Sequence, residues 1–340
     1  MSFLRNTWYC AAWSKEASRT PLGRTLLNEK VVLYRKENSE PVALSGVCPH
    51  RFAPMHLGKL HGNTLACPYH GLEFGEDGGC QRNPHGPVIP PGLRLKAYPV
   101  IEMHGVIWIW MGDPQRVDEA LIPDMSFHVD PKYATVEGLI AIVGSYELVA
   151  DNLLDLSHTQ YLHPLLVFAD EPGTQRENRV HREGDMLITE FNELNNKPTG
   201  LTFVMWEKAP ERLDSRAGIR WQAPANMVLT LRQVSRDPNV PGDIGFFQSH
   251  LVTPETDKTC HYFWAISRDF RQQETALSEQ FIAITAAVFT NEDGAMIAKV
   301  QENMGDETDL LGLRPVILPT DKAAVQARSI LRKLINAENA

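Results

Sequence analysis

Residues 151–163 read Asp-Asn-Leu-Leu-Asp-Leu-Ser-His-Thr-Gln-Tyr-Leu-His and place two imidazoles shortly after an amide and a carboxyl group. Asn152, Asp155 and His158 lie three residues apart, so on a helix they share one face. His163 lies five residues beyond His158 and converges with it only if the helix ends or distorts there, which the following proline favours. The pattern is typical of a metal site, although an amphipathic core helix with hydrogen-bonded, inert histidines also fits it.

A long helix predicted from about Thr275 to Glu302 supplies a further candidate ligand. Its apolar residues recur every three or four positions, at Leu277, Phe281, Ile284, Val288 and Phe289. Asp293 lies four residues beyond Phe289 and therefore falls on this apolar stripe. A carboxylate facing a core is costly unless it is paired, protonated or bound to a metal. His158, His163 and Asp293 form the two-histidine, one-carboxylate set of mononuclear non-haem iron sites; a paired structural aspartate is the alternative.

Length and composition indicate a globular enzyme of two domains. The chain has 340 residues, more than a typical single core, with 43% hydrophobic and 22% charged residues. A net charge of −9 and a pI near 5.7 argue against non-specific binding to nucleic acid or a membrane surface. No signal peptide and no apolar run of about 20 residues is evident. The cysteines are few and odd in number, which predicts a reducing compartment, the cytoplasm: Cys10, Cys48, Cys67, Cys80 and Cys260.

The first third of the chain is predicted to be a compact antiparallel β domain. Short β-branched or aromatic runs, Val31–Tyr34, Val42–Leu44 and Val106–Met111, are separated by Gly, Pro, Asn and Asp. The last run is apolar at every position, which predicts a central strand buried on both faces. A turn-rich stretch then places the boundary near residue 125, giving domains 1–125 and 126–340.

The second domain is predicted to be an antiparallel sheet with helices packed on it, so that the whole chain has an α+β fold. Five strand candidates carry this prediction: Leu139–Val143, Met186–Phe191, Met227–Val234, Phe246–Val252 and His261–Ile266.

Two loops of the first domain carry further metal ligands. They read Cys48-Pro-His50 and, sixteen residues later, Cys67-Pro-Tyr-His70. Two thiolates and two imidazoles can hold a structural zinc or a Rieske-type [2Fe–2S] cluster, with the cysteines on one iron and the histidines on the other. The single residue between Cys48 and His50 favours the cluster, because zinc ligand pairs more often have two to four residues between them.

These motifs together resemble those of the Rieske non-haem iron oxygenases. The loops match the cluster-binding signature of that family, and its D/N-x2-D-x2-H-x4-H helix matches at Asn152, Asp155, His158 and His163, with Asp293 as third iron ligand. The resemblance covers nearly the whole chain and points to the vanillate O-demethylase and dicamba monooxygenase group. It implies a Rieske domain, a helix-grip-like catalytic domain, a [2Fe–2S] cluster and a mononuclear Fe(II).

The resemblance also implies an activity and its partners. O2 would be the co-substrate, with NADH electrons delivered by a separate reductase, with or without a ferredoxin, because the chain has no G-x-G-x-x-G βαβ signature. The product would be a phenol plus formaldehyde from a methoxylated aromatic acid. The alternative activity is hydroxylation of a ring carbon or another substituent, such as a methyl or sulfonated arene. A non-catalytic electron-transfer protein and a zinc-stabilised binding protein are rival classes.

Two further implications of the resemblance concern assembly and substrate. The carboxylate of Asp155 would hydrogen-bond a histidine ligand and link it to a cluster histidine of a neighbouring subunit, which predicts a homotrimer. His250 matches the histidine that holds the substrate carboxylate in dicamba-type enzymes, unless it is a strand histidine facing solvent. Leu229 and Ile284 stand where that group has an asparagine and a tryptophan, which weakens the case for dicamba itself. Asn226 is the candidate to replace the missing amide.

Overall fold

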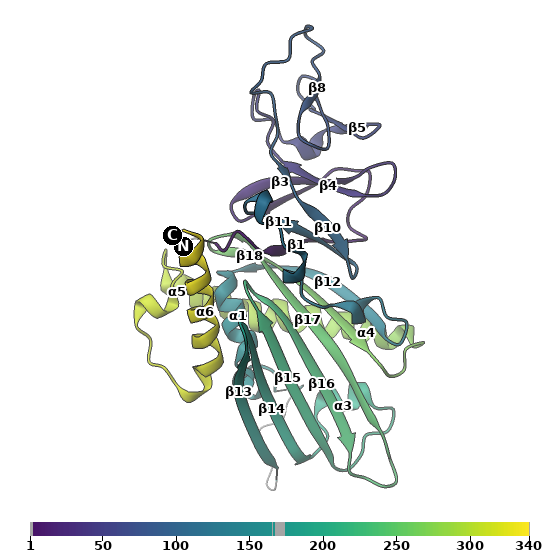
Figure 1. Ribbon diagram of the computed structural model, residues 1–340. Helices are drawn as coiled ribbons and strands as arrows, with labels where there is room; N and C mark the ends of the chain where they lie inside the picture. Colours follow the sequence, from purple (N-terminus) through teal and green to yellow (C-terminus); the bar gives the residue numbers. More distant parts are fainter. Residues whose placement is uncertain (1–2, 165, 167–173, 340) are drawn as a thin grey trace. The chain divides into compact units, whose positions relative to one another are not determined.

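The computed structural model describes residues 3–164, 166 and 174–339, and the chain forms two compact units (Figure 1). The first unit comprises Phe3–Ile122 and Thr253–Asp257; the second comprises Pro123–Val252 and Lys258–Ala340. The short segment 253–257 joins the first unit through backbone contacts, such as the 2.9 Å hydrogen bond from the N–H of Leu27 to the carbonyl of Pro254. A single cut of the chain near residue 125 therefore leaves out one part of the first unit.

The first unit is built from three small antiparallel sheets, with strand orders β1-β11-β10, β2-β3-β4-β9 and β5-β6-β7-β8. β11 lies at the centre of its sheet and all its residues are buried, as its uninterrupted apolar sequence predicted. The strands are β1 Trp8–Trp13, β2 Leu22–Leu26, β3 Glu29–Arg35, β4 Pro41–Ser45, β5 Lys59–His61, β6 Thr64–Ala66, β7 Glu73–Phe74, β8 Cys80–Arg82, β9 Ala97–Tyr98, β10 Val100–Met103 and β11 Val106–Trp110. Single helical turns occur at η1 Met55–Leu57, η2 Pro114–Arg116 and η3 Glu119–Leu121.

The second unit is built on one seven-stranded antiparallel sheet, with strand order β12-β18-β17-β16-β15-β14-β13. Its strands are β12 Ala134–Val143, β13 Gln175–Glu183, β14 Met186–Asn196, β15 Leu213–Gln222, β16 Asn226–Ser235, β17 Asp243–Thr256 and β18 Thr259–Arg268. The five predicted strands are confirmed, and so is the α+β class. Sequence analysis missed β13 and β15; β13, at the edge of the sheet, is exposed at most positions and so has no apolar alternation.

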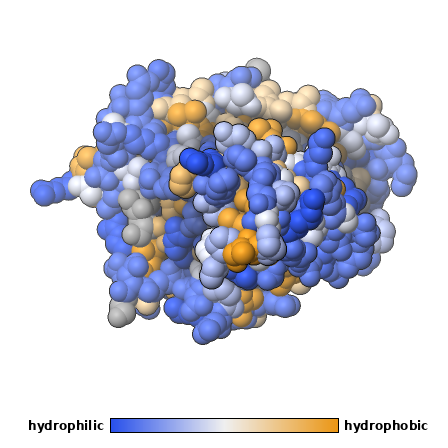
Figure 2. Space-filling view, turned by 90° about the horizontal axis from the view of Figure 1, so that it is seen from above, coloured by the Kyte–Doolittle hydropathy of each residue, from blue (hydrophilic) through white to orange (hydrophobic). Residues whose placement is uncertain are grey.

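Helices pack against this sheet, with α4 and α5 on β12 and α6 on β14. The helices are α1 Tyr146–Leu154, α2 Thr159–Leu162, α3 Gly200–Met205, α4 Thr275–Ala287, α5 Gly294–Met304 and α6 Lys322–Glu338. Shorter turns are η4 Ser126–His128, η5 Leu156–His158, η7 Leu310–Leu313 and η8 Pro319–Asp321. The face seen in Figure 2 is mostly hydrophilic, with smaller hydrophobic areas between the hydrophilic side chains.

The predicted long helix is present over 275–304, but it is not a regular α-helix. A π-helical segment, η6 Val288–Asp293, separates α4 from α5. By length and composition alone, this is the one helix among the described residues that could cross a membrane. Leu277, Phe281 and Ile297 are nevertheless buried inside the unit, as expected for a helix that packs on a sheet.

α6 is anchored to α1 by a buried arginine. The guanidinium of Arg328, 4% exposed, donates to both carboxylate oxygens of Asp151 and, at 2.6 Å, to Oε2 of Glu147. A buried guanidinium requires such multiple acceptors because an unpaired charge in the interior is strongly unfavourable. This pairing holds α1 in place, and the segment 151–163 begins in the last turn of α1.

Candidate metal centres

The segment 151–163 is bent rather than a single helix. α1 ends at Leu154, and Asp155 has extended geometry, with φ −115° and ψ 93°. The carboxylate of Asp155 accepts a 2.9 Å hydrogen bond from the N–H of Ser157 and so caps the next turn, η5. The prediction that Asn152, Asp155 and His158 share one continuous helix face is wrong. The bend, together with the end of α2 at Leu162, is what brings His158 and His163 together.

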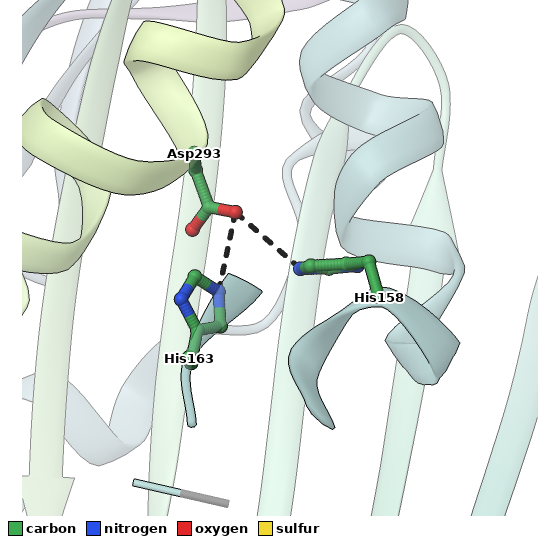
Figure 3. Close-up of side chains that lie close together, drawn as sticks. All are labelled: His158, His163 and Asp293. Carbon is green, nitrogen blue, oxygen red and sulfur yellow. Dashed lines mark ion pairs between the residues drawn. The ribbon is translucent and has the colours of Figure 1, made fainter. Parts of the chain in front are cut away.

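His158, His163 and Asp293 converge on one point. Each offers a ligand atom, and these atoms lie within 4.8 Å of one another. Nε2 of His158 lies 3.3 Å, and Nε2 of His163 3.2 Å, from Oδ1 of Asp293 (Figure 3). His163 and Asp293 are 7% and 2% exposed, whereas the side chain of His158 is 24% exposed. The three predicted iron ligands thus form one half-buried site.

Each imidazole is oriented by an acceptor on its other nitrogen. Nδ1 of His158 lies 2.5 Å from the backbone carbonyl of Asp155, and Nδ1 of His163 lies 2.5 Å from Oε2 of Glu292. With the Nδ1 protons donated to these acceptors, both Nε2 lone pairs face the site, which is the usual arrangement of metal-bound histidines. The resemblance implied a carboxylate contact from Asp155, but the contact is made by its main chain. Glu292 follows Asn291 and would point to the edge of a regular helix, but here it supports a ligand.

The charges of the site suit a divalent cation. Burial opposes ionisation of Asp293, but its close contacts with the imidazoles of His158 and His163 outweigh burial and lower its pKa to about 2. Burial also disfavours the charged form of His163, yet Asp293 and Glu292 raise its pKa overall. Two carboxylates beside two imidazoles form an anionic, partly buried pocket, and Fe(II) is a cation that this donor set binds.

Asp293 reaches the site because of the π-helical segment. The N–H of Gly294 donates to the carbonyl of Phe289, five residues earlier, instead of four. A β-carbon at Gly294 would lie 2.5 Å from that carbonyl oxygen and 3.2 Å from Cδ1 of Ile142, so the wide turn can close only on glycine. π-helical turns of this kind often occur at functional sites.

The two cysteine–histidine loops of the first unit share one backbone design. In each, the cysteine N–H donates to the carbonyl five residues later, and the cysteine carbonyl accepts from the N–H four residues later. That fourth residue has a left-handed backbone in both loops, Phe52 with φ 56° and Gly71 with φ 68°. The loops therefore present Cys48 and Cys67 in equivalent positions.

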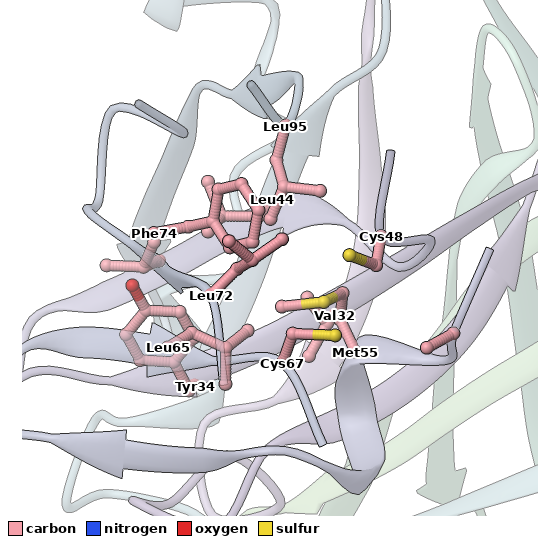
Figure 4. Packing of buried hydrophobic residues seen from close by; sticks show 12 residues of the cluster. Val32, Tyr34, Leu44, Cys48, Met55, Leu65, Cys67, Leu72, Phe74 and Leu95 are labelled. Atoms are coloured by element: carbon pink, nitrogen blue, oxygen red, sulfur yellow. The ribbon is translucent and has the colours of Figure 1, made fainter. Parts of the chain in front are cut away.

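The four loop ligands are divided between the interior and the surface. The thiols of Cys48 and Cys67 are 1% and 3% exposed and lie at one end of a hydrophobic core (Figure 4). Burial raises the pKa of Cys48 to about 11, and Cys67 acts in the same direction. The imidazoles of His50 and His70 are more accessible and lie with their ring centroids 4.6 Å apart. A cluster held here has its cysteine side in the core and its histidine side outward.

The spacing of these ligands distinguishes zinc from a two-iron cluster. A single tetrahedral zinc needs its donor atoms within about 4 Å of one another. In the part of the chain that the structure describes, the iron-site triad is the only set of three His, Cys, Asp or Glu donors within 4.8 Å. The cysteines and histidines of the loops are thus too widely spread for one ion, which favours the cluster over zinc. None of the five cysteines forms a disulfide bond in the described part of the chain.

His250 lies in β17, on the side of the sheet that faces the iron site. It is 2% exposed, which excludes a solvent-facing strand histidine. Its ring is 6.0 Å from that of Phe289, which belongs to the same π-helical segment as Asp293. Burial lowers the pKa of His250 to about 3 against the opposite effect of Asp293, so the imidazole is uncharged.

The other predicted pocket residues differ in whether they lie on the same side of the sheet as His250. Met227 pairs with His250 across the sheet, so Leu229, two residues further along β16, projects from the same face. Asn226 pairs with Leu251 and projects from the opposite face, so the structure does not favour it as the replacement amide. Ile284 is half-buried in α4, four residues before the π-helical segment begins. Contact of Leu229 and Ile284 with substrate stays a prediction.

Comparison with known proteins shows which families the two parts of the chain match. Residues 7–99 match the Rieske [2Fe-2S] domain, and residues 142–337 match the vanillate O-demethylase oxygenase C-terminal domain. The chain is 36% identical to the oxygenase component of chloroacetanilide N-alkylformylase from Rhizorhabdus wittichii, over 99% of this chain and 97% of that protein. It is also 36% identical to the oxygenase component of dicamba O-demethylase from Stenotrophomonas maltophilia, over the full length of both.

Solved structures of dicamba monooxygenase extend the likeness to three dimensions. The complex with 3,6 dichlorosalicylic acid matches with a TM-score of 0.91 and 34% identity over the whole of both chains. The complex with non-heme iron and dicamba matches with a TM-score of 0.86 and 33% identity, over 100% of this chain and 99% of the other. The similarity therefore extends over both units.

Proposed function

Because this chain belongs to the Rieske oxygenases, in the group of vanillate O-demethylase oxygenase components, we propose that it removes the methyl group of a methoxylated aromatic acid. The observation that carries this proposal is the convergence of His158, His163 and Asp293 within 4.8 Å beside the buried His250. One methoxyarene, O2, NADH and a proton would give a phenol, formaldehyde, NAD+ and water.

Two separate sets of residues would bind the two metal centres. Cys48, Cys67, His50 and His70 would hold the [2Fe–2S] cluster, and His158, His163 and Asp293 would hold Fe(II). When bound, these groups would supply single-electron transfer and the activation of O2. Asn152 and Glu292 hold the ligands in place through hydrogen bonds to Asp293 and His163.

The wall beside the iron site would orient the aromatic ring. Phe289 contacts the rings of both His250 and Tyr262, at centroid distances of 6.0 and 4.7 Å. Leu229 and Ile284 add aliphatic bulk in place of the polar and aromatic side chains of the dicamba-type pocket. Such a wall holds a ring by its apolar faces and leaves His250 to bind a polar substituent.

The same proposal includes a cytoplasmic homotrimer that receives NADH electrons from a separate reductase. Its relatives are named as oxygenase components, which supports a separate electron donor. His158 and Asp155 line a pocket of about 300 Å³ between α1, α5 and α6, so one edge of the iron site is open to a neighbouring molecule. Light scattering of the purified protein tests the trimer directly.

Turnover of a substrate panel tests the demethylation. Iron-replete protein, O2, NADH and a competent reductase are incubated with methoxybenzoates that differ in ring position, and phenol and formaldehyde are measured. We expect equimolar phenol and formaldehyde from at least one member. Oxygenated products without formaldehyde would instead support the hydroxylation of another arene carbon, and demethylation would be the wrong assignment.

A further inference from the structure

The hydrogen-bond partner of His250 determines which of its nitrogens faces a substrate. We propose that Tyr262 holds His250 in the tautomer with its proton on Nε2, so that His250 is an uncharged donor that selects substrates carrying an acceptor atom. This inference rests on the proposed function for the location of the substrate. It assigns to Tyr262 the role of a positioning residue that determines specificity.

Tyr262 and His250 form a closely matched buried pair. They lie on β18 and β17, with ring planes at 6° to one another and centroids 5.9 Å apart. The Tyr262 hydroxyl lies 2.7 Å from Nδ1 of His250. Tyr262 is 0% and His250 2% exposed, so water does not compete for this contact. Among the described residues, the hydroxyl of Tyr262 has no second hydrogen-bond partner.

The direction of this hydrogen bond follows because the buried hydroxyl proton of Tyr262 requires an acceptor. A buried hydroxyl that does not donate leaves its proton unpaired, which is costly in an apolar interior. Burial raises the pKa of Tyr262 well above its usual value, so the proton stays on the phenol. The hydroxyl therefore donates and Nδ1 of His250 accepts. A neutral imidazole that accepts through Nδ1 carries its proton on Nε2.

Among the residues that the structure describes, none pairs with the Nε2 donor. It is fully buried and unpaired, and so is Nε1 of Trp221. Trp221 pairs with Met227, and Met227 pairs with His250, so all three side chains project from the same face of the sheet. Both unpaired groups are donors only, and the residue between them is apolar. The side chains of His250, Met227 and Trp221 therefore suit a ligand with acceptor atoms, because a donor group of the ligand would face the N–H groups of His250 and Trp221.

An uncharged hydrogen-bond donor can bind more than one kind of substituent. A carboxylate oxygen and an amide carbonyl can both accept from Nε2–H, whereas a cationic side chain would favour the carboxylate. The shared chemistry is an acceptor oxygen next to the methoxy-bearing ring. Which of the two substituents binds more tightly is decided by separate arms of the same experiment.

Calorimetric titration without reductase tests the inference, because no turnover then occurs. The ligands are 2-methoxybenzoate, 2-methoxybenzamide and methoxybenzene, which lacks the second acceptor. We expect the wild-type protein to bind at least one of the first two more tightly than methoxybenzene. Tyr262→Phe should weaken that binding by about tenfold, because the imidazole can then place its proton on either nitrogen. Binding of methoxybenzene should change by less than about twofold.

Three matched variants complete the test. His250→Gln retains an N–H donor that does not depend on Tyr262, so adding Tyr262→Phe to it should have no further effect. Tyr9→Phe removes another buried tyrosine hydroxyl, bonded to the carbonyl of Leu4 in the first unit, and should leave all three affinities unchanged. Histidine 15N spectra of the wild type and Tyr262→Phe, assigned with His250→Gln, should show the proton on Nε2 in the wild type and shared between Nδ1 and Nε2 in Tyr262→Phe.

Two results would overturn the assignment: equal weakening for all three ligands in Tyr262→Phe, or a wild-type spectrum with the His250 proton on Nδ1. Absence of formaldehyde once reductase is added would count against the proposed demethylation. It would leave the tautomer and the binding preference to be decided by titration and spectroscopy.

Discussion

The side-chain amide of Asn152 donates a 3.1 Å hydrogen bond to Oδ1 of Asp293, the same oxygen that faces Nε2 of both His158 and His163. α1 thereby contributes to the iron site without contributing a ligand, since it holds the carboxylate supplied by the end of η6. Arg328 in turn fixes α1 through Asp151, the residue before Asn152. The orientation of the carboxylate thus depends on a chain of contacts that reaches α6.

Replacement of Asn152 should therefore weaken the binding of iron without disturbing the cluster. We expect Asn152→Ala to lower Fe(II) affinity by about 10- to 100-fold, the usual cost of losing a residue that orients a metal ligand. Equilibrium dialysis against Fe(II), with metal analysis, measures it. Asn178→Ala, on the exposed strand β13, is the control. Loss of all three irons together would indicate unfolding and contradict the assigned role.

Glu292 is expected to orient His163 through its charge as well as its position. Its Oε2 accepts from Nδ1 of His163, and a carboxylate makes a stronger acceptor than an amide. Fe(II) affinity should fall modestly in Glu292→Gln and by about 10- to 100-fold in Glu292→Ala. Glu279→Ala, on the exposed side of α4, should bind iron normally. If the Gln variant were as impaired as the Ala variant, hydrogen-bond acceptance by this residue would not matter.

Substitution of Gly294 gives a test in which two effects have opposite sign. In a regular helix, Gly→Ala is stabilising by about 1 kcal/mol. Here the added β-carbon would lie 2.5 Å from the carbonyl oxygen of Phe289, so the π-helical turn has to open. We expect Gly294→Ala to be destabilising by about 1–3 kcal/mol and to lose iron first, because Asp293 moves with the turn.

Thermal unfolding and iron analysis of the same samples measure both effects of Gly294→Ala. Gly218→Ala serves as the control, since a β-carbon there meets only one atom, at 3.7 Å. A more stable Gly294→Ala protein with normal iron content would mean that the turn does not require glycine.

The sequence was sufficient to predict the ligands but not the geometry that joins them. The spacing of His158 and His163 and the position of Asp293 on an apolar stripe made them candidates, and the resemblance to the Rieske oxygenases selected them as the expected iron ligands. The bend at Asp155 and the π-helical turn were not predictable, since each depends on a local choice of backbone hydrogen bond. Glu292 was missed for the same reason: an ideal helix directs it away from His163.

The strands show a similar division. β11 was found because all its residues are apolar, and β16 because it contains the apolar and β-branched run Met-Val-Leu-Thr-Leu, residues 227–231. β15 carries charges and a glycine within its length, Leu-Asp-Ser-Arg-Ala-Gly-Ile-Arg-Trp-Gln, and is held in the sheet by pairing with β14 and β16 on either side. Such a strand is specified by tertiary context rather than by its own pattern. The same holds for the segment 253–257, whose place in the first unit depends on contacts far away in sequence.

The equivalent backbones of the two cluster loops predict opposite effects at Phe52 and Gly71. Both residues have left-handed conformations, which cost a residue with a β-carbon about 1–2 kcal/mol. The ring of Phe52 is 79% exposed, so little packing is lost on its removal. Phe52→Gly should therefore raise the stability of the cluster unit by up to about 1 kcal/mol, after allowing for the greater flexibility of glycine in the unfolded chain. Gly71→Ala should lower it by about the same amount.

Loss of the visible absorbance of the cluster during heating measures both changes. Phe52→Ala is the matched control, because it removes the ring but keeps the β-carbon and hence the strain. The order of stability should be Phe52→Gly above Phe52→Ala, with Phe52→Ala close to the wild type. If Phe52→Gly and Phe52→Ala unfolded at the same temperature, the left-handed conformation at this position would not be costly. The structural equivalence of the two loops would then carry no energetic consequence.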